Sequence, residues 1–401
     1  MMSSVAQPKP SLRLHFLDGL RGLACLYVLL FHASTPHIPY GGELSPLMKF
    51  VKRSISCGHF SVVFFIVLSG FSIMLPIARS GTGRLNGGLV DYARRRARRI
   101  LPPYYVALLL SIALIVGYNF LSRRSGLGPP VVDNALSAGS VVSHFLLVHN
   151  VRFDWAYRIN GPLWSVATEW QIYFLFAAIF LPFWRRAGIA SLIAAWVVGL
   201  LPFLLLPADD NFFWASPWFV GSFMFGVWGA AIHFDPAHKD SWLRNHAPWA
   251  ALSALCFGFI AVLVATGRSE TWSLPLMDFI VTVFAFCLIN ACTQRCHVPG
   301  ESERSWLLRS FGSRSLAYLG GFSYSLYLVQ HPVLRLAEKI VAKLTQNVNT
   351  NIQIHLLVVV PITMVIAWVF SELCERPFTS GGVILPALRR RAPQATSQSA
   401  S

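Results

Sequence analysis

Residues 17–32 read LDGLRGLACLYVLLFH, an apolar run that carries three ionisable side chains, Asp18, Arg21 and His32. A membrane crossing takes about 20 apolar residues, and an ionisable group inside one costs about 2.5–3.5 kcal/mol on insertion scales. Such groups therefore face a cavity or a partner. Eleven residues at about 100° each put Arg21 and His32 on one helix face, roughly 16 Å apart along the axis. Two plainer interpretations stay open: a local Asp18–Arg21 ion pair, and a His32 wetted at the membrane interface.

The rest of the chain has the same apolar character. Of its 401 residues, 12% are charged and 55% hydrophobic, whereas a soluble domain is about 25% charged. This excludes an ordinary soluble enzyme and a disordered protein. We expect an all-α, polytopic membrane protein whose domain covers 17–378, between a cytoplasmic segment 1–16 and a cytoplasmic, disordered tail 379–401. Its ten transmembrane helices are predicted near 17–33, 58–78, 101–121, 163–184, 187–206, 211–232, 249–266, 274–292, 315–333 and 352–373.

The basic residues predict the orientation of these helices. With both termini in the cytoplasm, the cytoplasmic segments hold 21 of the 33 Lys and Arg residues and the outer segments 11. This bias is typical of multi-pass proteins. The net charge of +16 is therefore read as contact with the lipids of the cell (inner or plasma) membrane rather than with nucleic acid. The segment 122–160 is polar and irregular, with a short apolar piece that is expected to be re-entrant or to lie on the surface.

No metal site is expected. Among the seven cysteines, the nearest approach to a metal motif is Cys292, Cys296 and the neighbouring His297. This is half a site, with the wrong spacing for a zinc finger.

The fourth predicted helix carries one polar stripe. Ser165, Glu169 and Tyr173 are spaced by four residues, and Glu169 is the only charge of that helix. A buried carboxylate that stays ionised needs a cation such as Arg21 or a histidine. The alternative is a structural hydrogen bond between helices.

The ninth predicted helix also has a polar face, made of Tyr324, Tyr327 and His331 at i, i+3 and i+7. Pro332 is expected to break or end this helix, while Gly320 and Gly321 allow close helix packing. The alternative is a packing surface with an interfacial histidine. Asp278 and His355, in the eighth and tenth helices, have no partner that the sequence names and are interpreted as structural.

Five arginines precede the third predicted helix, in a stretch expected to be a loop: Arg94, Arg95, Arg96, Arg98 and Arg99. At a cytoplasmic surface they can bind anionic lipid. Guanidinium groups are equally suited to a phosphate-rich ligand.

Together these pieces resemble the acyltransferase 3 family, the membrane O-acyltransferases that modify polysaccharides and other glycosides. The matching motifs are LDGLRG with His32 beyond it, FIVLSGF at 65–71, RRARRILPPY at 95–104, WSVATEWQIY at 164–173 and SYSLYL at 323–328. They follow the family's order over nearly the whole chain. Where the family often has a histidine, this chain has Gln330, and the histidine follows as His331.

The resemblance implies an acyltransferase that moves groups other than amino-acyl groups. Its donor would be cytoplasmic acyl-CoA carrying an acetyl or short acyl chain, with no bound cofactor, and its acceptor a glycan or glycoside hydroxyl at the outer side. The catalytic residues would be His32 as general base or transient acyl carrier, Arg21 and Glu169. The substrate-binding residues would be Arg95, Arg98, Arg99, Tyr104, Ser69, Trp164, Ser165, Tyr173, Tyr324 and Tyr327. The alternative is a non-enzymatic transporter or flippase of a lipid-linked glycan.

The polar residues also predict the geometry of the site. Burying three ionisable side chains at separate places in an apolar bundle would cost more free energy than placing them in one water-filled cavity. We therefore expect His32, Glu169 and Arg21 to line one cavity that connects the two membrane faces.

Overall fold

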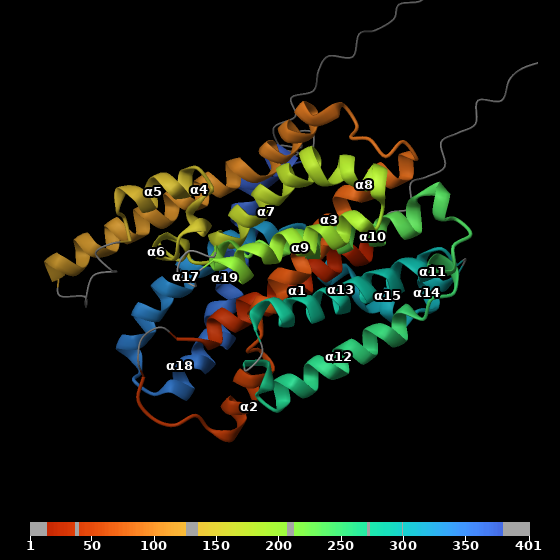
Figure 1. Ribbon diagram of the computed structural model, residues 1–401. Helices are drawn as coiled ribbons and strands as arrows, with labels where there is room; N and C mark the ends of the chain where they lie inside the picture. Colours follow the sequence, from red (N-terminus) through yellow and green to blue (C-terminus); the bar gives the residue numbers. More distant parts are fainter. Residues whose placement is uncertain are drawn as a thin grey trace, which may run out of the picture.

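The computed structural model describes residues 14–36, 40–125, 135–206, 212–270, 273–298 and 300–379. These residues form helices joined by turns, with one isolated bridge between Gly41 and Asn347. Most of the long helices run along a common direction (Figure 1). The all-α prediction is confirmed for this part of the chain. The predicted N-terminal segment and the predicted tail lie almost entirely outside it.

The helices of ten residues or more make up the bundle. They are α1 (His15–Ser34), α3 (Gly58–Ser80), α4 (Gly88–Ser125), α7 (Leu163–Leu175), α9 (Ala190–Leu205), α10 (Phe219–Phe234), α12 (Trp249–Ala265), α13 (Leu274–Cys296), α17 (Ser323–Leu344) and α19 (Val360–Phe370).

Shorter helices connect and extend them. They are α2 (Pro46–Ser54), α5 (Ala138–Phe145), α6 (Phe153–Ala156), α8 (Leu181–Ala187), α11 (Trp242–Asn245), α14 (Glu301–Arg304), α15 (Trp306–Phe311), α16 (Arg314–Gly321), α18 (Val348–Ile354) and α20 (Arg376–Thr379). Helices α2 and α18 lie at one end of the bundle, and α11, α14 and α15 at the other (Figure 1).

Each of the ten predicted apolar stretches overlaps helical structure. Among the described residues, seven helical segments are long and apolar enough to cross a membrane: His15–Ser34, Pro46–Ser80, Gly88–Arg124, Leu163–Ala187, Phe213–Phe234, Leu274–Cys296 and Val348–Phe378. Helices α9 and α12 are apolar but shorter. Helix α17 has the length, yet its second half carries four charged side chains: Arg335, Glu338, Lys339 and Lys343.

The region before the third predicted helix is helical, which corrects the expectation of a loop. Helix α4 starts at Gly88 and includes all five arginines. Arginine has a high helix propensity, so the charged stretch joins the apolar one without a break. The arginines consequently point in fixed directions around the helix.

The prediction that Pro332 breaks or ends its helix is wrong. Helix α17 runs through Pro332 to Leu344. Proline removes one main-chain hydrogen bond, and helices of membrane bundles tolerate this where neighbouring groups compensate. The break lies earlier, at Phe322, between α16 and α17.

The described part of the 122–160 segment packs into the bundle. His144, His149, Asn150 and Asn160 are fully buried there. Asn160 Nδ2 donates a hydrogen bond to the Leu328 carbonyl oxygen of α17 at 2.9 Å. Its buried polar residues thus take part in the packing, while Val142 and Leu146 of the short apolar piece are 56% and 63% exposed.

Close contacts between helix backbones hold α1 against α16. A Cβ atom added at Gly320 would lie 1.9 Å from the Asp18 carbonyl oxygen, and one at Gly22 would lie 2.4 Å from the Leu316 carbonyl oxygen. A Cβ at the adjacent Gly321 would meet nothing within 4 Å. Of the two glycines predicted to allow close packing, Gly320 is the one at the contact.

This difference between neighbours predicts unequal effects of alanine. We expect Gly320→Ala to destabilise the protein by about 1–3 kcal/mol, because α1 must move away from α16. Gly321→Ala should be neutral or slightly stabilising, because alanine favours the helix. Thermal unfolding of both variants in detergent measures the difference. Equal melting temperatures would contradict the close contact.

Candidate functional site

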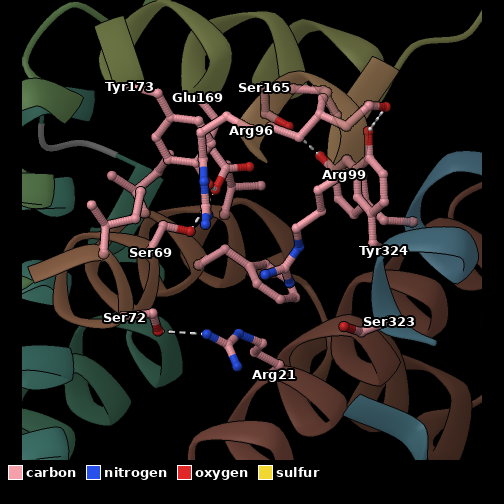
Figure 2. Close-up of a pocket in the computed structure, with 17 residues that line it drawn as sticks. Arg21, Ser69, Ser72, Arg96, Arg99, Ser165, Glu169, Tyr173, Ser323 and Tyr324 are labelled. Carbon is pink, nitrogen blue, oxygen red and sulfur yellow. Dashed lines mark hydrogen bonds between the residues drawn. The ribbon is translucent and has the colours of Figure 1, made fainter. Parts of the chain in front are cut away.

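A cavity inside the bundle gathers most of the predicted polar residues. Five helices line it, its volume is about 110 Å³, and it is partly open to the outside. Its walls are Arg21 of α1; Val62, Phe65, Ile66, Ser69, Ser72 and Ile73 of α3; Arg96, Arg99 and Ile100 of α4; Ser165, Val166, Glu169 and Tyr173 of α7; and Ser323, Tyr324 and Tyr327 of α17 (Figure 2).

The polar stripe of α7 faces this cavity, as its spacing predicts. Glu169 Oε1 accepts hydrogen bonds from the Ser69 hydroxyl at 2.5 Å and from the Tyr173 hydroxyl. The Ser165 and Tyr327 hydroxyls are 2.6 Å apart and share a hydrogen bond. Hydroxyl donors therefore bind the Glu169 carboxylate, where the sequence suggested a cation.

Arg21 lies at the end of the cavity nearest Ser72. It donates to the Asp18 carboxylate at 3.0 Å and to the Ser72 hydroxyl at 2.5 Å. The local Asp18–Arg21 ion pair is thus present, and Arg21 lines the cavity as well. The contact with Ser72 joins α1 to α3 and fixes the direction of the guanidinium (Figure 2).

Only part of the arginine cluster faces the cavity. Arg96 and Arg99, one turn apart on α4, line it together with Arg21 (Figure 2). Arg94 pairs with Asp91 at 3.5 Å, and Arg95 donates to the Asn86 carbonyl oxygen at 2.8 Å. Neither Arg95 nor Arg98, both predicted to bind substrate, lines the cavity. The helical start of α4 is the reason, because it turns successive arginines to different sides.

The Arg96 guanidinium is only partly satisfied. Its carbon lies 5.9 Å from the ring centres of both Tyr92 and Tyr173. Its Nε–H is buried and has no hydrogen-bond partner within the described ranges. Three guanidinium groups and one carboxylate, Glu169, line this cavity, so its walls carry net positive charge. Such a surface is suited to an anion.

Two further predicted substrate-binding residues lie away from the cavity. Tyr104 is fully buried, and its hydroxyl donates to the His144 carbonyl oxygen at 2.8 Å. It joins α4 to α5. Trp164 does not line the cavity but packs against His59, with ring centres 6.0 Å apart. Tyr324 and Tyr327 do line the cavity.

His32 lies in a second, much smaller pocket, whose volume is about 10 Å³. This pocket also holds His331, Arg335, Glu338 and His355, and the His32 and His331 rings lie 6.1 Å apart. The structure therefore separates the three residues expected in one cavity: Arg21 and Glu169 share the large cavity, and His32 lines the other pocket. The helix spacing alone could not show where the open space ends.

The sequence also missed two polar contacts. Ser72 follows Ser69 by three residues, so the same helix face could have indicated it. Asp278, interpreted as a lone structural residue, accepts hydrogen bonds from Trp218 Nε1 at 2.8 Å and from His59 Nε2 at 2.9 Å. His59 is 219 residues from Asp278, and no spacing in the sequence joins them.

Comparison with known proteins agrees with the motifs. A family model described as an acyltransferase domain matches residues 14–372. The chain is 22% identical over 392 residues to a Listeria monocytogenes protein named peptidoglycan O-acetyltransferase OatA, covering 92% of this chain and 56% of that protein.

Other relatives carry similar names. The chain is 23% identical over 384 residues to a Bacillus subtilis protein named putative peptidoglycan O-acetyltransferase YrhL, covering 91% of this chain and 55% of that protein. It is 22% identical over 389 residues to a Staphylococcus aureus protein named putative O-acetyltransferase SACOL0978, with coverages of 92% and 57%. The chain thus spans about half the length of these relatives. No solved structure matches it.

The different places of Tyr104 and Tyr173 predict different costs of losing a hydroxyl. Tyr104→Phe removes one of two donors to the fully buried His144 carbonyl oxygen, whose other donor is the Leu147 N–H at 3.2 Å, so we expect a loss of about 1 kcal/mol. Tyr173→Phe removes one of two donors to Glu169, and water in the open cavity can replace it. Its loss of stability should be smaller. Melting temperatures of the two variants test this, and a larger loss for Tyr173→Phe would contradict the assignment.

Proposed function

The chain belongs to the acyltransferase 3 family, and we propose that it is an integral membrane O-acyltransferase. In this proposal it moves an acetyl or short acyl group from cytoplasmic acyl-CoA to a hydroxyl of a glycan or glycoside at the outer side of the membrane. The observation that carries the proposal is the cavity where Arg21, Arg96 and Arg99 converge beside Glu169. The family assignment favours an enzyme over a transporter.

The proposed topology has about ten crossings and both termini in the cytoplasm. The seven long apolar segments, the shorter α9 and α12, and α17 together supply that number. The excess of Lys and Arg on the predicted cytoplasmic side supports the orientation. In this arrangement the start of α4 and the Arg21 end of the cavity face the cytoplasm, and His32 lies toward the outer side of the cell membrane.

The arginine end of the cavity is the proposed donor site. Acyl-CoA carries phosphate groups at one end and the acyl thioester at the end of a long arm. Guanidinium groups bind phosphate through several parallel hydrogen bonds. Arg96 has a buried donor to offer, and Arg21 and Arg99 add positive charge. The phosphates would bind there, so that the arm extends along α3 toward the outer side.

The acceptor would enter from the outer side. Relatives at 22–23% identity are named for O-acetylation of peptidoglycan, which supports a glycan hydroxyl as acceptor. A thioester is already activated, so the reaction needs a base for the hydroxyl and a site that excludes water. His32 is the proposed general base or transient acyl carrier, because a neutral imidazole performs either task near neutral pH.

A matched pair of double variants tests the donor site. Arg96→Ala/Arg99→Ala should raise the KM for acetyl-CoA about 10-fold or more, because two charged contacts to phosphate are lost. Arg94→Ala/Arg98→Ala removes the same charge from the same helix without touching the cavity, so its KM should stay near the wild-type value. Steady-state kinetics of the protein in lipid nanodiscs measure both. An equal rise in the two variants would indicate a general effect on charge or topology.

His32→Ala should abolish transfer without loss of the folded protein. Either proposed role requires a ring nitrogen, which alanine lacks. Release of free CoA and O-acetylated product by the purified variant measure the effect. The exposed His246→Ala variant is the control and should keep wild-type rates. Near-normal product formation by a well-folded His32→Ala protein would contradict both roles.

A further inference from the structure

His59 and Asp278 form a second imidazole–carboxylate pair, outside the residues assigned above. His59 Nε2 lies 2.9 Å and 3.1 Å from the two carboxylate oxygens. Asp278 is fully buried, whereas the His59 side chain is 27% exposed. The Trp218 indole N–H donates to the same carboxylate at 2.8 Å. A carboxylate that receives an indole N–H acts as an acceptor, so the Nε2 of His59 carries a proton.

The other ring nitrogen of His59 is available. In the described part of the chain no residue forms a hydrogen bond with Nδ1, and the atom is not enclosed. With the proton held on Nε2, Nδ1 of the neutral ring presents its lone pair. A buried carboxylate on one ring nitrogen and an open lone pair on the other is the arrangement that makes histidine a base in hydrolases.

His59 lies on the same face of α3 as residues that line the cavity. His59, Val62, Ile66 and Ser69 follow each other at three- and four-residue intervals on α3, so they share one helix face. The last three line the cavity. His59 therefore lies one turn beyond the cavity, at the end opposite Arg21 and Ser72. Thirteen residues separate Ser72 from His59, roughly 20 Å along the helix.

Aromatic rings surround His59. The His59 ring is nearly parallel to Trp164, which directly precedes the cavity residue Ser165. Phe31 of α1 packs on Gly58, the residue before His59, since a Cβ atom there would lie 2.3 Å from the Phe31 ring. The Phe31 ring also lies 5.2 Å from that of His32. Phe31 thus contacts both His32 and the start of α3, next to His59.

We propose that His59, oriented by Asp278, is the group that takes the proton from the acceptor hydroxyl. This rests on the proposed acyl transfer and leaves His32 the role of transient acyl carrier, which has already taken the acyl group from the thioester and released CoA. Nδ1 of His59 removes the hydroxyl proton while the oxygen bonds to the acyl carbon. The bond from that carbon to the His32 nitrogen then breaks. That nitrogen takes the proton from Nδ1, so the products are the ester and unmodified His32. Asp278 is the positioning residue, because it fixes the ring and holds the proton on Nε2.

The test uses the 401-residue chain in nanodiscs, with acetyl-CoA as donor and soluble peptidoglycan fragments as acceptor. His59→Gln retains a side chain that can bond Asp278 but cannot take up a proton. We expect kcat to fall about 100-fold or more, with the KM for acetyl-CoA unchanged. Imidazole added to His59→Ala should restore part of the rate, because the ring position is accessible.

A matched control separates this role from a structural one. His233→Gln makes the same substitution at a fully buried histidine beside His297, outside both pockets, so it should keep most of the wild-type kcat. A His59→Gln protein within about threefold of wild type would overturn the proposal. So would equal losses in His59→Gln and His233→Gln without rescue of His59→Ala by imidazole, since that pattern describes a role in packing. A wild-type protein that transfers no acetyl group would contradict the proposed function itself, and the role of His59 with it.

Discussion

A charged side chain on a helix inside an apolar bundle is stabilised by polar partners, and the arrangement of the helices depends on where these partners lie. Water is scarce there, so an unmatched charge is costly. Arg21 meets Asp18 and Ser72, Glu169 meets two hydroxyl groups, and Asp278 meets His59 and an indole N–H. The contacts Arg21–Ser72, Glu169–Ser69 and Asp278–His59 join different helices, and Asp278–Trp218 joins α13 to the residue before α10. The polar residues therefore fix how the helices are rotated against each other, and the cavity forms where three of the helices present such groups.

The sequence predicts the parts that depend on one helix at a time. Hydropathy locates the apolar stretches, because the period and length of a helix fix what can cross a membrane. The spacing of Ser165, Glu169 and Tyr173 predicts a single polar face, and all three line the cavity. Gly320 lies at a close contact between helices, as the sequence predicts, because a glycine without a side chain lets a neighbouring backbone approach.

The sequence does not predict features that depend on how two helices pack together. The arginines before the apolar part of α4 look alike, and only the helical start at Gly88 decides that Arg96 and Arg99 face inward while Arg95 and Arg98 do not. His59 and Asp278 lie on helices far apart in the chain, so their contact follows from the packing of α3 and α13. The prediction of a helix break at Pro332 is wrong because it holds for an isolated helix, whereas neighbouring helices in the bundle stabilise α17 across the proline.

Side chains, not the path of a helix, separate His32 from the cavity. One face of α17 contributes residues to both the cavity and the pocket of His32. On α17, Tyr324 and Tyr327 line the cavity, and His331, one turn further on the same face, lines the pocket of His32. The Tyr327 ring meets Phe65 at 6.3 Å, and its hydroxyl is bonded to Ser165. Two aromatic side chains thus lie at the end of the cavity away from Arg21, directly before the histidines. Under the proposed function, a donor that arrives along α3 from Arg21 would meet His59 and His32 only past these rings, so the contacts of Tyr327 with Ser165 and Phe65 would set how far its thioester can reach.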